Sequence, residues 1–218
     1  MLRADFHIHT RYSPDSVMSV KSLVARCLKA GLTCIAVTDH NTIEGALETA
    51  KIAPFRVIIG EEVKSAGGEL TGLFLKEPVP KGLPPLETVK RIKAQGGLVS
   101  IPHPFDIYRR SVITPEALAE VLPHADIIEA FNARNNLQSA NRKAADLAKR
   151  HGKLVSAVSD SHTAYEVGRT YTEMPDFNGT PQDFLRALGE AKLVARPTTP
   201  LIHAVTTMTK VRKRLLGR

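Results

Sequence analysis

Cysteine and long hydrophobic runs are scarce in this sequence of 218 residues. Its two cysteines, Cys27 and Cys34, both stand among apolar residues. Two buried thiols exclude a disulfide framework and fit a reducing, cytoplasmic compartment. No apolar run approaches the roughly 18–20 residues of a membrane span. The opening MLRADFHIHT also lacks the charged and then apolar pattern of a secretory leader. We therefore expect a cytoplasmic protein without a membrane segment.

Glycine-rich phosphate loops are missing as well. The sequence contains neither G-x-x-x-x-G-K-[ST] nor G-x-G-x-x-G, which argues against nucleotide binding by either loop. Ser100 and Ser159 stand near His103 and Asp160, but neither serine lies in a G-x-S-x-G turn. A nucleophilic serine is therefore not supported.

Most of the net charge of +8 comes from the end of the chain. The last nine residues, KVRKRLLGR, contain five basic side chains and no acidic one. Removing these five from the 30 lysines and arginines leaves 25 against 22 acidic residues, or +3. The tail is either a solvated or amphipathic helix, or an element that attracts nucleic acid.

Short apolar runs alternate with helical patterns along the chain. The first strand-like run ends at residues 7–9. Further strand-like runs lie at 33–37, 56–60, 97–101, 126–131, 153–159 and 192–195. Helical patterns lie at 19–30, 42–52, 86–95, 115–121, 137–150 and 181–190. Gly67 and Gly68 separate two further strand-like stretches, which is typical of a β-hairpin. About six or seven such units predict a closed or nearly closed α/β barrel, and an open doubly wound sheet is the alternative.

Ligand-capable side chains lie where the predicted strands end, and they include five of the eight histidines. The residues are His7, His9, Asp39, His40, Glu61, Glu62, His103, Asp160 and His162, with Glu69 in the hairpin. The carboxyl ends of barrel strands are where active sites form. The spacing in H-x-H and D-x-H points both side chains of each pair to one face of a strand. A lone H-x-H also occurs on exposed strands. The prediction of a multi-metal hydrolase therefore rests on the repeated placement of ligand-capable residues at the ends of the predicted strands.

Five segments in this order resemble the PHP (polymerase and histidinol phosphatase) family, namely FHIHTRYSPDS, AVTDHNTIEG, GEEV, IPHPFD and VSDSH. The resemblance implies a distorted (β/α)7 TIM-like barrel with two to three divalent ions, Mn, Fe or Zn, at the C-terminal face of the strands. It also implies a phosphoesterase domain over 1–196, whose closing segment is about 164–196. A basic extension then covers 197–218.

The resemblance implies ligands for each ion. One ion would take His7, His9, Glu62 and Asp160, a second would share Glu62 and add His103, and a third would take Asp15, His40 and His162. The family pattern G-x-E-x selects Glu62 over Glu61, and only one of two adjacent strand residues can point inward. Glu69 stands where the family often has histidine, and a carboxylate there would complete the second ion.

Catalytic roles are less constrained by the sequence. His40, Asp39 or His162 would protonate the leaving oxygen, and Asp39 would otherwise orient an imidazole. We expect the hydrogen-bond donors that contact phosphate among the loop arginines, which are Arg11, Arg109, Arg110, Arg134 and Arg169. We favour Arg134 and Arg110, because a planar guanidinium matches phosphate oxygens.

We therefore expect a metal-dependent phosphoesterase that hydrolyses phosphomonoesters of a small metabolite or nucleotide with a metal-activated water. One alternative is a 5′–3′ exonuclease or a nucleotide 3′,5′-bisphosphate phosphatase. The other is a non-catalytic, metal-binding regulatory module. The expected partners are the phosphorylated substrate and, through the basic tail, nucleic acid.

Overall fold

A computed structural model describes residues 1–135, 137–199 and 201–215 of the chain. In these residues nine strands form one sheet, in the order β7-β6-β5-β4-β3-β2-β1-β8-β9. The strands are β1 (Leu2–Asp5), β2 (Cys34–Val37), β3 (Arg56–Ser65), β4 (Gly68–Leu73), β5 (Leu98–Ile101), β6 (Ile127–Asn132), β7 (Leu154–Val158), β8 (Tyr171–Met174) and β9 (Lys192–Val194). The helices are α1 (Val20–Ala30), α2 (Glu44–Ile52), α3 (Pro85–Ala94), α4 (Pro115–Val121), α5 (Gln138–Arg150), α6 (Pro181–Leu188) and α7 (Leu201–Leu215), with a short 3-10 helix at Leu122–His124.

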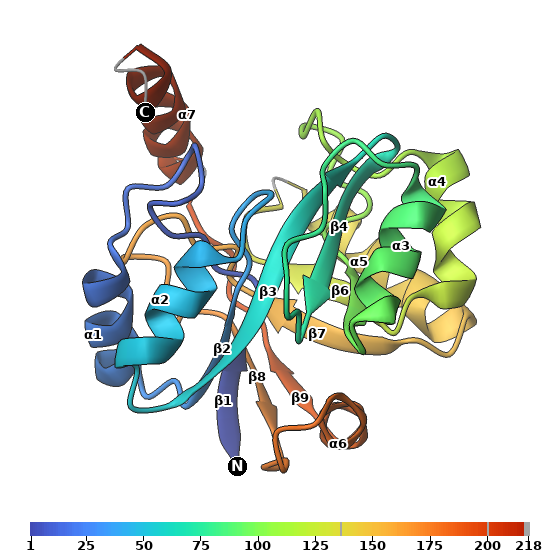
Figure 1. Cartoon of the computed structure of the whole chain (residues 1–218), viewed down its shortest axis with the longest axis horizontal. Helices are drawn as coiled ribbons and strands as arrows, with labels where there is room; N and C mark the ends of the chain where they lie inside the picture. The colour runs from blue at the N-terminus through green and yellow to red at the C-terminus, as the bar shows by residue number, and fades with distance from the viewer. Residues whose placement is uncertain (136, 200, 216–218) are drawn as a thin grey trace.

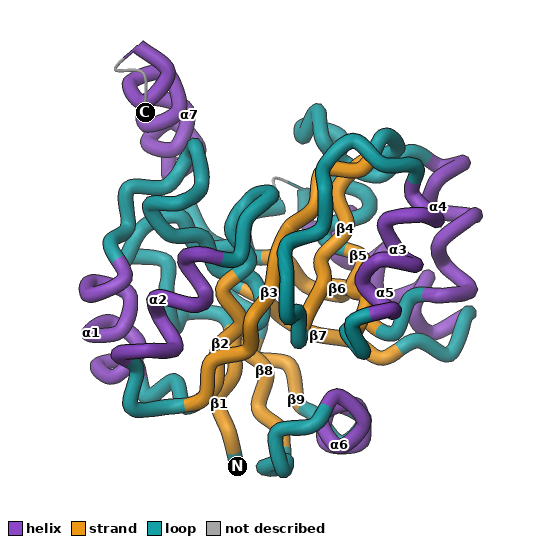
Figure 2. Tube along the Cα trace, in the orientation of Figure 1, coloured by secondary structure: helices purple, strands orange, loops and turns teal. Residues whose placement is uncertain are grey.

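The sheet curls into a nearly closed barrel. Strands β1, β2 and β3 are parallel neighbours, and so are β5, β6 and β7. Beyond the strand ends, Ile8 and Ser161 form a parallel bridge, and the His9 N–H donates to the Ser161 carbonyl at 2.8 Å. Helices α1 and α2 cover one side of the barrel, and α3, α4 and α5 cover the other (Figures 1 and 2). The predicted α/β barrel is thus confirmed.

The exact count of seven βα units is not confirmed. Strand β4 lies antiparallel between β3 and β5, because the chain turns back in the predicted hairpin. Strand β8, which we did not predict, pairs antiparallel with β1 and with β9. The hairpin also carries β3 past its predicted end at residue 60. Glu62 and Glu69 therefore lie inside strands, not beyond their ends.

Local signals set the bounds of α1. The side chain of Ser19 accepts a hydrogen bond from the Ser22 N–H, and Gly31 ends the helix at a φ of 72°, a conformation that favours glycine. The apolar face of α1 buries Cys27, and Cys34 is buried in β2. Burial raises the pKa of both thiols to about 12, so both stay protonated at neutral pH.

Four phenylalanine rings pack together at the end of the barrel that α6 covers. The ring of Phe184 in α6 meets Phe6, Phe74 and Phe177 edge to face at centroid distances of 5.0, 5.3 and 5.3 Å. Figure 1 shows α6 near the N-terminus, whereas α7 rises at the other end of the molecule. The phenylalanine cluster thus lies at the end of the barrel opposite α7.

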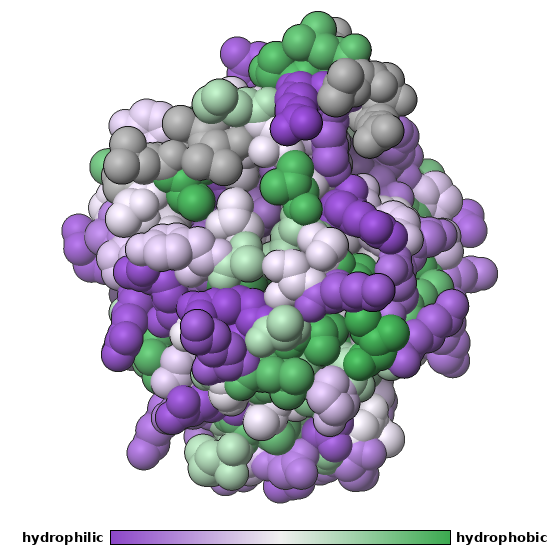
Figure 3. All heavy atoms as spheres, turned by 90° about the vertical axis from the view of Figure 1, so that its left-hand side faces the viewer, coloured by the Kyte–Doolittle hydropathy of each residue, from purple (hydrophilic) through white to green (hydrophobic). Residues whose placement is uncertain are grey.

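The outer surface mixes polar and apolar side chains. Figure 3 shows hydrophobic patches between hydrophilic side chains on the face that α1 and α2 present. No helix in the described ranges combines the length and the apolar character that crossing a membrane requires. The basic end of the chain folds largely as α7. Of its predicted charges, Arg218 lies outside the described residues, as do the side chains of Lys210 and Arg214.

Candidate metal centre

All nine predicted metal ligands come together at one end of the barrel. In four overlapping groups, each residue offers a ligand atom within 4.8 Å of the others in its group. The groups are His9, Asp15, His40 and His162; His7, Glu62 and His103; His7, His9 and Asp160; and His40, Glu62 and Glu69. The arrangement agrees with the ligand sets that the family resemblance implies, and their ligand role stays a prediction.

The two histidines after β1 face each other and two carboxylates. The Nε2 atoms of His7 and His9 are 3.0 Å apart. Glu62 Oε2 is 3.4 Å from both nitrogens, and Asp160 Oδ1 is 3.8 Å from His7 and 3.4 Å from His9. All four side chains are fully buried. Two imidazole nitrogens and two carboxylate oxygens thus converge on one small volume.

Glu62 lies at the centre of the cluster. Its Oε2 is 3.1 Å from His40 Nδ1, and its Oε1 is 3.0 Å from His103 Nε2. Burial opposes the ionisation of Glu62, but the charges of His7 and His40 outweigh it and hold the pKa of this carboxyl well below its ordinary value. The neighbouring Glu61 points the other way, and its Oε2 accepts the Val79 N–H at 2.7 Å. Strand alternation therefore places only Glu62 in the cluster.

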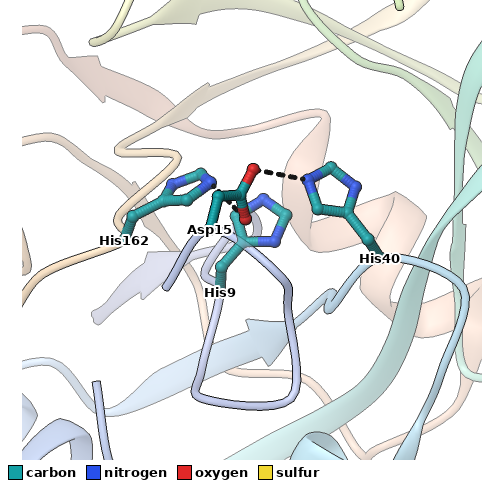
Figure 4. A group of neighbouring side chains, drawn as sticks. All are labelled: His9, Asp15, His40 and His162. Atoms are coloured by element: carbon teal, nitrogen blue, oxygen red, sulfur yellow. Dashed lines mark ion pairs between the residues drawn. The ribbon is translucent and has the colours of Figure 1, made fainter. Parts of the chain in front are cut away.

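Asp15 forms the outermost group with three histidines (Figure 4). Its Oδ2 is 3.4 Å from His40 Nε2, and its Oδ1 is 3.3 Å from His162 Nε2. The side chains of Asp15 and His40 are each 16% exposed, whereas His9 is fully buried. This group therefore connects the buried cluster with solvent.

Several buried oxygen atoms of the cluster accept no hydrogen bond, and this bears on whether the cluster fits metal ions. Within the described residues, Glu62 Oε2, Asp160 Oδ1 and Asp15 Oδ1 are buried and accept no hydrogen bond. Such atoms are costly unless another partner satisfies them. Their lone pairs face the imidazole nitrogens described above, and this donor set suits Zn, Mn or Fe. The residues therefore fit a cluster of divalent ions.

Glu129 contacts His7 and His103 from behind the cluster. The sequence did not predict this residue as part of the site. Its Oε1 is 2.6 Å from His7 Nδ1, and its Oε2 accepts the His103 N–H at 3.0 Å. Asn132 Nδ2 bridges Glu129 Oε2 at 3.0 Å and Asp160 Oδ2 at 3.1 Å. A carboxylate that holds the second nitrogen of a ligating histidine fixes its ring orientation. The feature of the sequence that could have indicated Glu129 is its position as an acidic residue inside an otherwise apolar predicted strand.

Asp39 lies behind the cluster. Its Oδ1 accepts hydrogen bonds from the Thr10 N–H and from Ser13 Oγ, both at 2.6 Å. Ser13 Oγ in turn lies 3.0 Å from His9 Nδ1. Since the Ser13 proton goes to Asp39, His9 Nδ1 donates and its Nε2 lone pair faces the cluster. Gly45 makes room for this carboxylate, because a Cβ there would meet Asp39 Oδ2 at 2.0 Å. The arrangement favours the orienting role expected for Asp39.

A cavity of about 620 Å³ opens over the outermost group. It is lined by the carboxylates and imidazoles of Asp15, His40, Glu69 and His162, and by the cations Lys64, Arg109, Arg110 and Arg134. Both favoured arginines, Arg110 and Arg134, line the cavity. Arg134 is buried, 3.5 Å from Glu166 Oε1, and donates to Thr206 at 2.9 Å.

Arg109 is the arginine that contacts the cluster. It donates to Asp160 Oδ2 and, at 3.1 Å, to Asp106 Oδ2. Burial opposes its charge, but Asp160, Glu62 and Asp106 raise the pKa of Arg109 above its ordinary value. Arg109 is one of the loop arginines of the sequence analysis, which favours Arg134 and Arg110. Contact with Asp160 depends on how the loop after β5 folds, which sequence spacing does not report.

Two candidate ligands adopt backbone conformations that are rare outside glycine. His103 has a φ of 27° and Asp160 a φ of 53°. Residues with positive φ are strained and concentrate at functional sites. The fold thus holds both side chains in place at an energetic cost.

Two family models match parts of this chain, and two relatives from one organism are similar to it. The family model described as the PHP domain matches residues 5–78, and the one described as PHP-associated matches residues 138–193. The uncharacterized protein MJ1587 of Methanocaldococcus jannaschii is 44% identical over 147 residues, which cover 61% of this chain and 82% of that protein. MJ0417 of the same organism is 30% identical over 213 residues, or 96% of this chain and 86% of that protein.

Two solved structures share the fold at low sequence identity. One is a two-domain protein from Bacteroides vulgatus that contains a predicted PHP-like metal-dependent phosphoesterase, with a TM-score of 0.72 and 20% identity over 89% of this chain. This chain spans 65% of that protein's length. The other is the lesion-specific endonuclease PfuEndoQ from Pyrococcus furiosus, with a TM-score of 0.64 and 16% identity, covering 91% of this chain and 59% of the endonuclease.

The barrel, its histidine and carboxylate cluster and these matches define the class of the protein. The chain belongs to the PHP family.

The raised pKa values of two histidines predict that ion binding releases protons. Burial lowers the pKa of His40, but Glu62, Asp15 and Glu69 raise it to about 9, and the pKa of His7 is also raised. The raised pKa values favour the protonated form of both rings near neutral pH without ions, whereas a ligating imidazole must be neutral. We expect Mn²⁺ affinity to rise between pH 6.5 and 9, with about one proton released per affected histidine. Calorimetric titrations in two buffers with different protonation enthalpies measure this release, and zero release contradicts the assignment.

Proposed function

We propose that this protein is a metal-dependent phosphoesterase that hydrolyses phosphomonoesters of a small metabolite or nucleotide. The observation that supports this most is the cavity whose base is the outermost ligand group and whose wall contains Arg109, Arg110 and Lys64. A phosphoryl group carries several negatively charged oxygens, which divalent ions and guanidinium groups stabilise together.

Each ion position has a set of side chains in this proposal, and the first two sets share Glu62. His7, His9, Glu62 and Asp160 would hold one ion, and Glu62, His103 and Glu69 a second; Asp15, His40 and His162 would hold the third. Bound ions would supply a water of lowered pKa and neutralise charge on the phosphoryl oxygens. Glu129, Ser13 and Asp39 keep the imidazoles oriented through the hydrogen bonds described above. His40 and His162 both line the cavity, and either ring, when it is protonated and not bound to an ion, would donate a proton to the leaving group.

Three arginines have different parts in this proposal. Arg109 lies next to Asp160 on the cavity wall, so its guanidinium would contact a phosphoryl oxygen. Arg134 is engaged by Glu166 and Thr206, so we assign it to the wall and not to the substrate. Arg110 lines the same cavity and would contact a more distant part of the substrate.

Phosphate release with metal accounting tests the function. The protein is loaded with Mn, Fe or Zn, the bound metal is measured, and activity is assayed on p-nitrophenyl phosphate, histidinol phosphate, adenosine 3′,5′-bisphosphate and a 5′-phosphorylated oligonucleotide. We expect metal-dependent release from one or more of the small monoesters and loss of that release after chelation. Activity confined to the oligonucleotide would favour the exonuclease alternative. Bound metal without turnover would favour the regulatory module.

The assignment of Arg109 predicts a contrast between neighbouring arginines. Arg109→Met is expected to lower kcat/KM for the best monoester by about a hundredfold, because it removes a charge beside the reacting group. Arg110→Met is the matched control and should cost less than about tenfold, because Arg109, and not Arg110, donates to Asp160 in the described residues. Steady-state kinetics at constant metal occupancy measures both. Equal losses for the two variants would contradict the assignment.

A further inference from the structure

The last helix lies against the rim of the candidate metal centre. The linker before it is tied to the barrel, because the Thr198 N–H donates to the Ala133 carbonyl at 2.8 Å. Ile202 and Thr206 of α7 are buried, and Thr206 and Thr207 line the cavity. Figure 1 shows α7 rising beside the loop that follows β1. The segment expected as a basic extension therefore forms part of the cavity.

Lys213 connects α7 to the loop that carries Asp15. Its Nζ donates to the carbonyl oxygen of Arg11 at 2.7 Å and to that of Ser13 at 2.6 Å. These carbonyls stand four and two residues before Asp15 in the sequence. Asp39 fixes the base of the loop through Thr10 and Ser13, so Lys213 adds a second anchor.

The first half of α7 connects to the other side of the outermost group. Thr206 Oγ1 accepts a hydrogen bond from Arg134 at 2.9 Å, and Arg134 lies 3.5 Å from Glu166 Oε1. Glu166 Oε2 accepts the His162 N–H at 3.0 Å. One helix is thus linked at Lys213 to the loop of Asp15 and at Thr206 to the segment of His162. Both of these residues belong to the outermost ligand group.

We propose that α7 is a structural part of the outer ion site and that Lys213 is a positioning residue, which holds Asp15 at its distance from His40 and His162. The inference rests on the proposed function, because it requires that this group binds an ion. Two effects of Lys213 have opposite signs. As a cation close to Asp15 it repels a divalent ion, whereas as an anchor of the loop it raises the affinity of the site. Removing the side chain separates them.

The test is the affinity of the metal-stripped, full-length protein for Mn²⁺, measured by calorimetric titration with the bound metal counted. We assign the weakest ion to the outermost group, because Asp15 and His40 are partly exposed. For Lys213→Met we expect at least tenfold weaker binding of this ion and unchanged binding of the tighter ones. Arg212→Met is the matched control, because it removes the same charge from the adjacent, exposed position of α7. It should change no affinity by more than about twofold. Lys213→Arg retains a donor to the two carbonyls and should restore most of the affinity.

Circular dichroism and a thermal scan show whether each variant is folded. Unchanged or tighter binding of the weakest ion in folded Lys213→Met overturns the inference, because it leaves only the charge effect. Equal weakening of every ion, or the same weakening in Arg212→Met, also overturns it. These results leave the proposed function standing if the wild-type protein binds its ions and releases phosphate. A wild-type protein that takes up no ion overturns the proposed function and this inference together.

Discussion

Glu62→Gln is expected to lower phosphate release by at least about a thousandfold and to remove at least one bound ion per chain. The substitution keeps the size of the side chain but replaces a charged oxygen with an amide. Glu62 is the carboxylate shared between two of the four ligand groups, and its oxygens lie 3.0 to 3.4 Å from nitrogens of four histidines. Loss of its charge therefore affects adjacent ion positions at once.

The neighbouring residue provides a matched control for this prediction. Glu61 is also buried, but its Oε2 accepts the Val79 N–H on the other face of β3. Burial raises the pKa of Glu61 to about 7, so glutamine resembles the neutral form that is present below that pH. Glu61→Gln is expected to keep the metal content and to change activity by less than about threefold. Elemental analysis and kinetics on both variants measure the contrast. Full metal content in Glu62→Gln would contradict the central role of Glu62.

Removal of the ions is expected to lower the unfolding midpoint by at least about 10 °C. An ion at a hundred times its dissociation constant stabilises the folded state by about 2.7 kcal/mol. In a domain of this size each kcal/mol shifts the midpoint by roughly 2–4 °C, so two ions account for about 10–20 °C. The structural reason is that buried oxygens of Glu62, Asp160 and Asp15 have no hydrogen-bond donor within the described chain.

Calorimetric scans of the protein with Mn²⁺, after chelation and after Mn²⁺ is restored measure this shift. Glu62→Gln serves as the control, because a variant with fewer ions should lose less stability when it is chelated. A difference below about 2 °C for the wild-type protein would show that the cluster does not bind ions in the folded state.

The positions of the nine ligand candidates follow largely from local features of the sequence. Alternation along a strand places His7 and His9 on one face, and it separates Glu62 from Glu61. The apolar runs that precede these residues predict strands, and parallel strands bring their carboxyl ends to one end of a barrel. The family resemblance adds Asp15, which local pattern alone does not single out, and it assigns Glu69 of the hairpin to the second ion.

The residues that support the ligands were not predictable in the same way. His7 and Glu129 are 122 positions apart, and they meet only because the barrel nearly closes between β1 and β7. The Ser13 contact with His9 requires that the loop after β1 turns back on itself. Arg109, and not the favoured Arg134 or Arg110, contacts Asp160 because of the path of the loop after β5. Sequence periodicity reports the face on which a side chain lies, but not which distant side chain it meets.

The sequence by itself thus determined the type of fold and the donor atoms of the candidate metal centre, since both depend on local alternation and on the order of the motifs. Only the tertiary structure decided which groups orient those donors, and that α7 lies over the cavity. These contacts join segments far apart in the chain, and curvature of the sheet and packing of the loops bring them together. The basic tail shows the difference most clearly, because composition reported only its charge, whereas the fold placed Lys213 on the loop that carries Asp15.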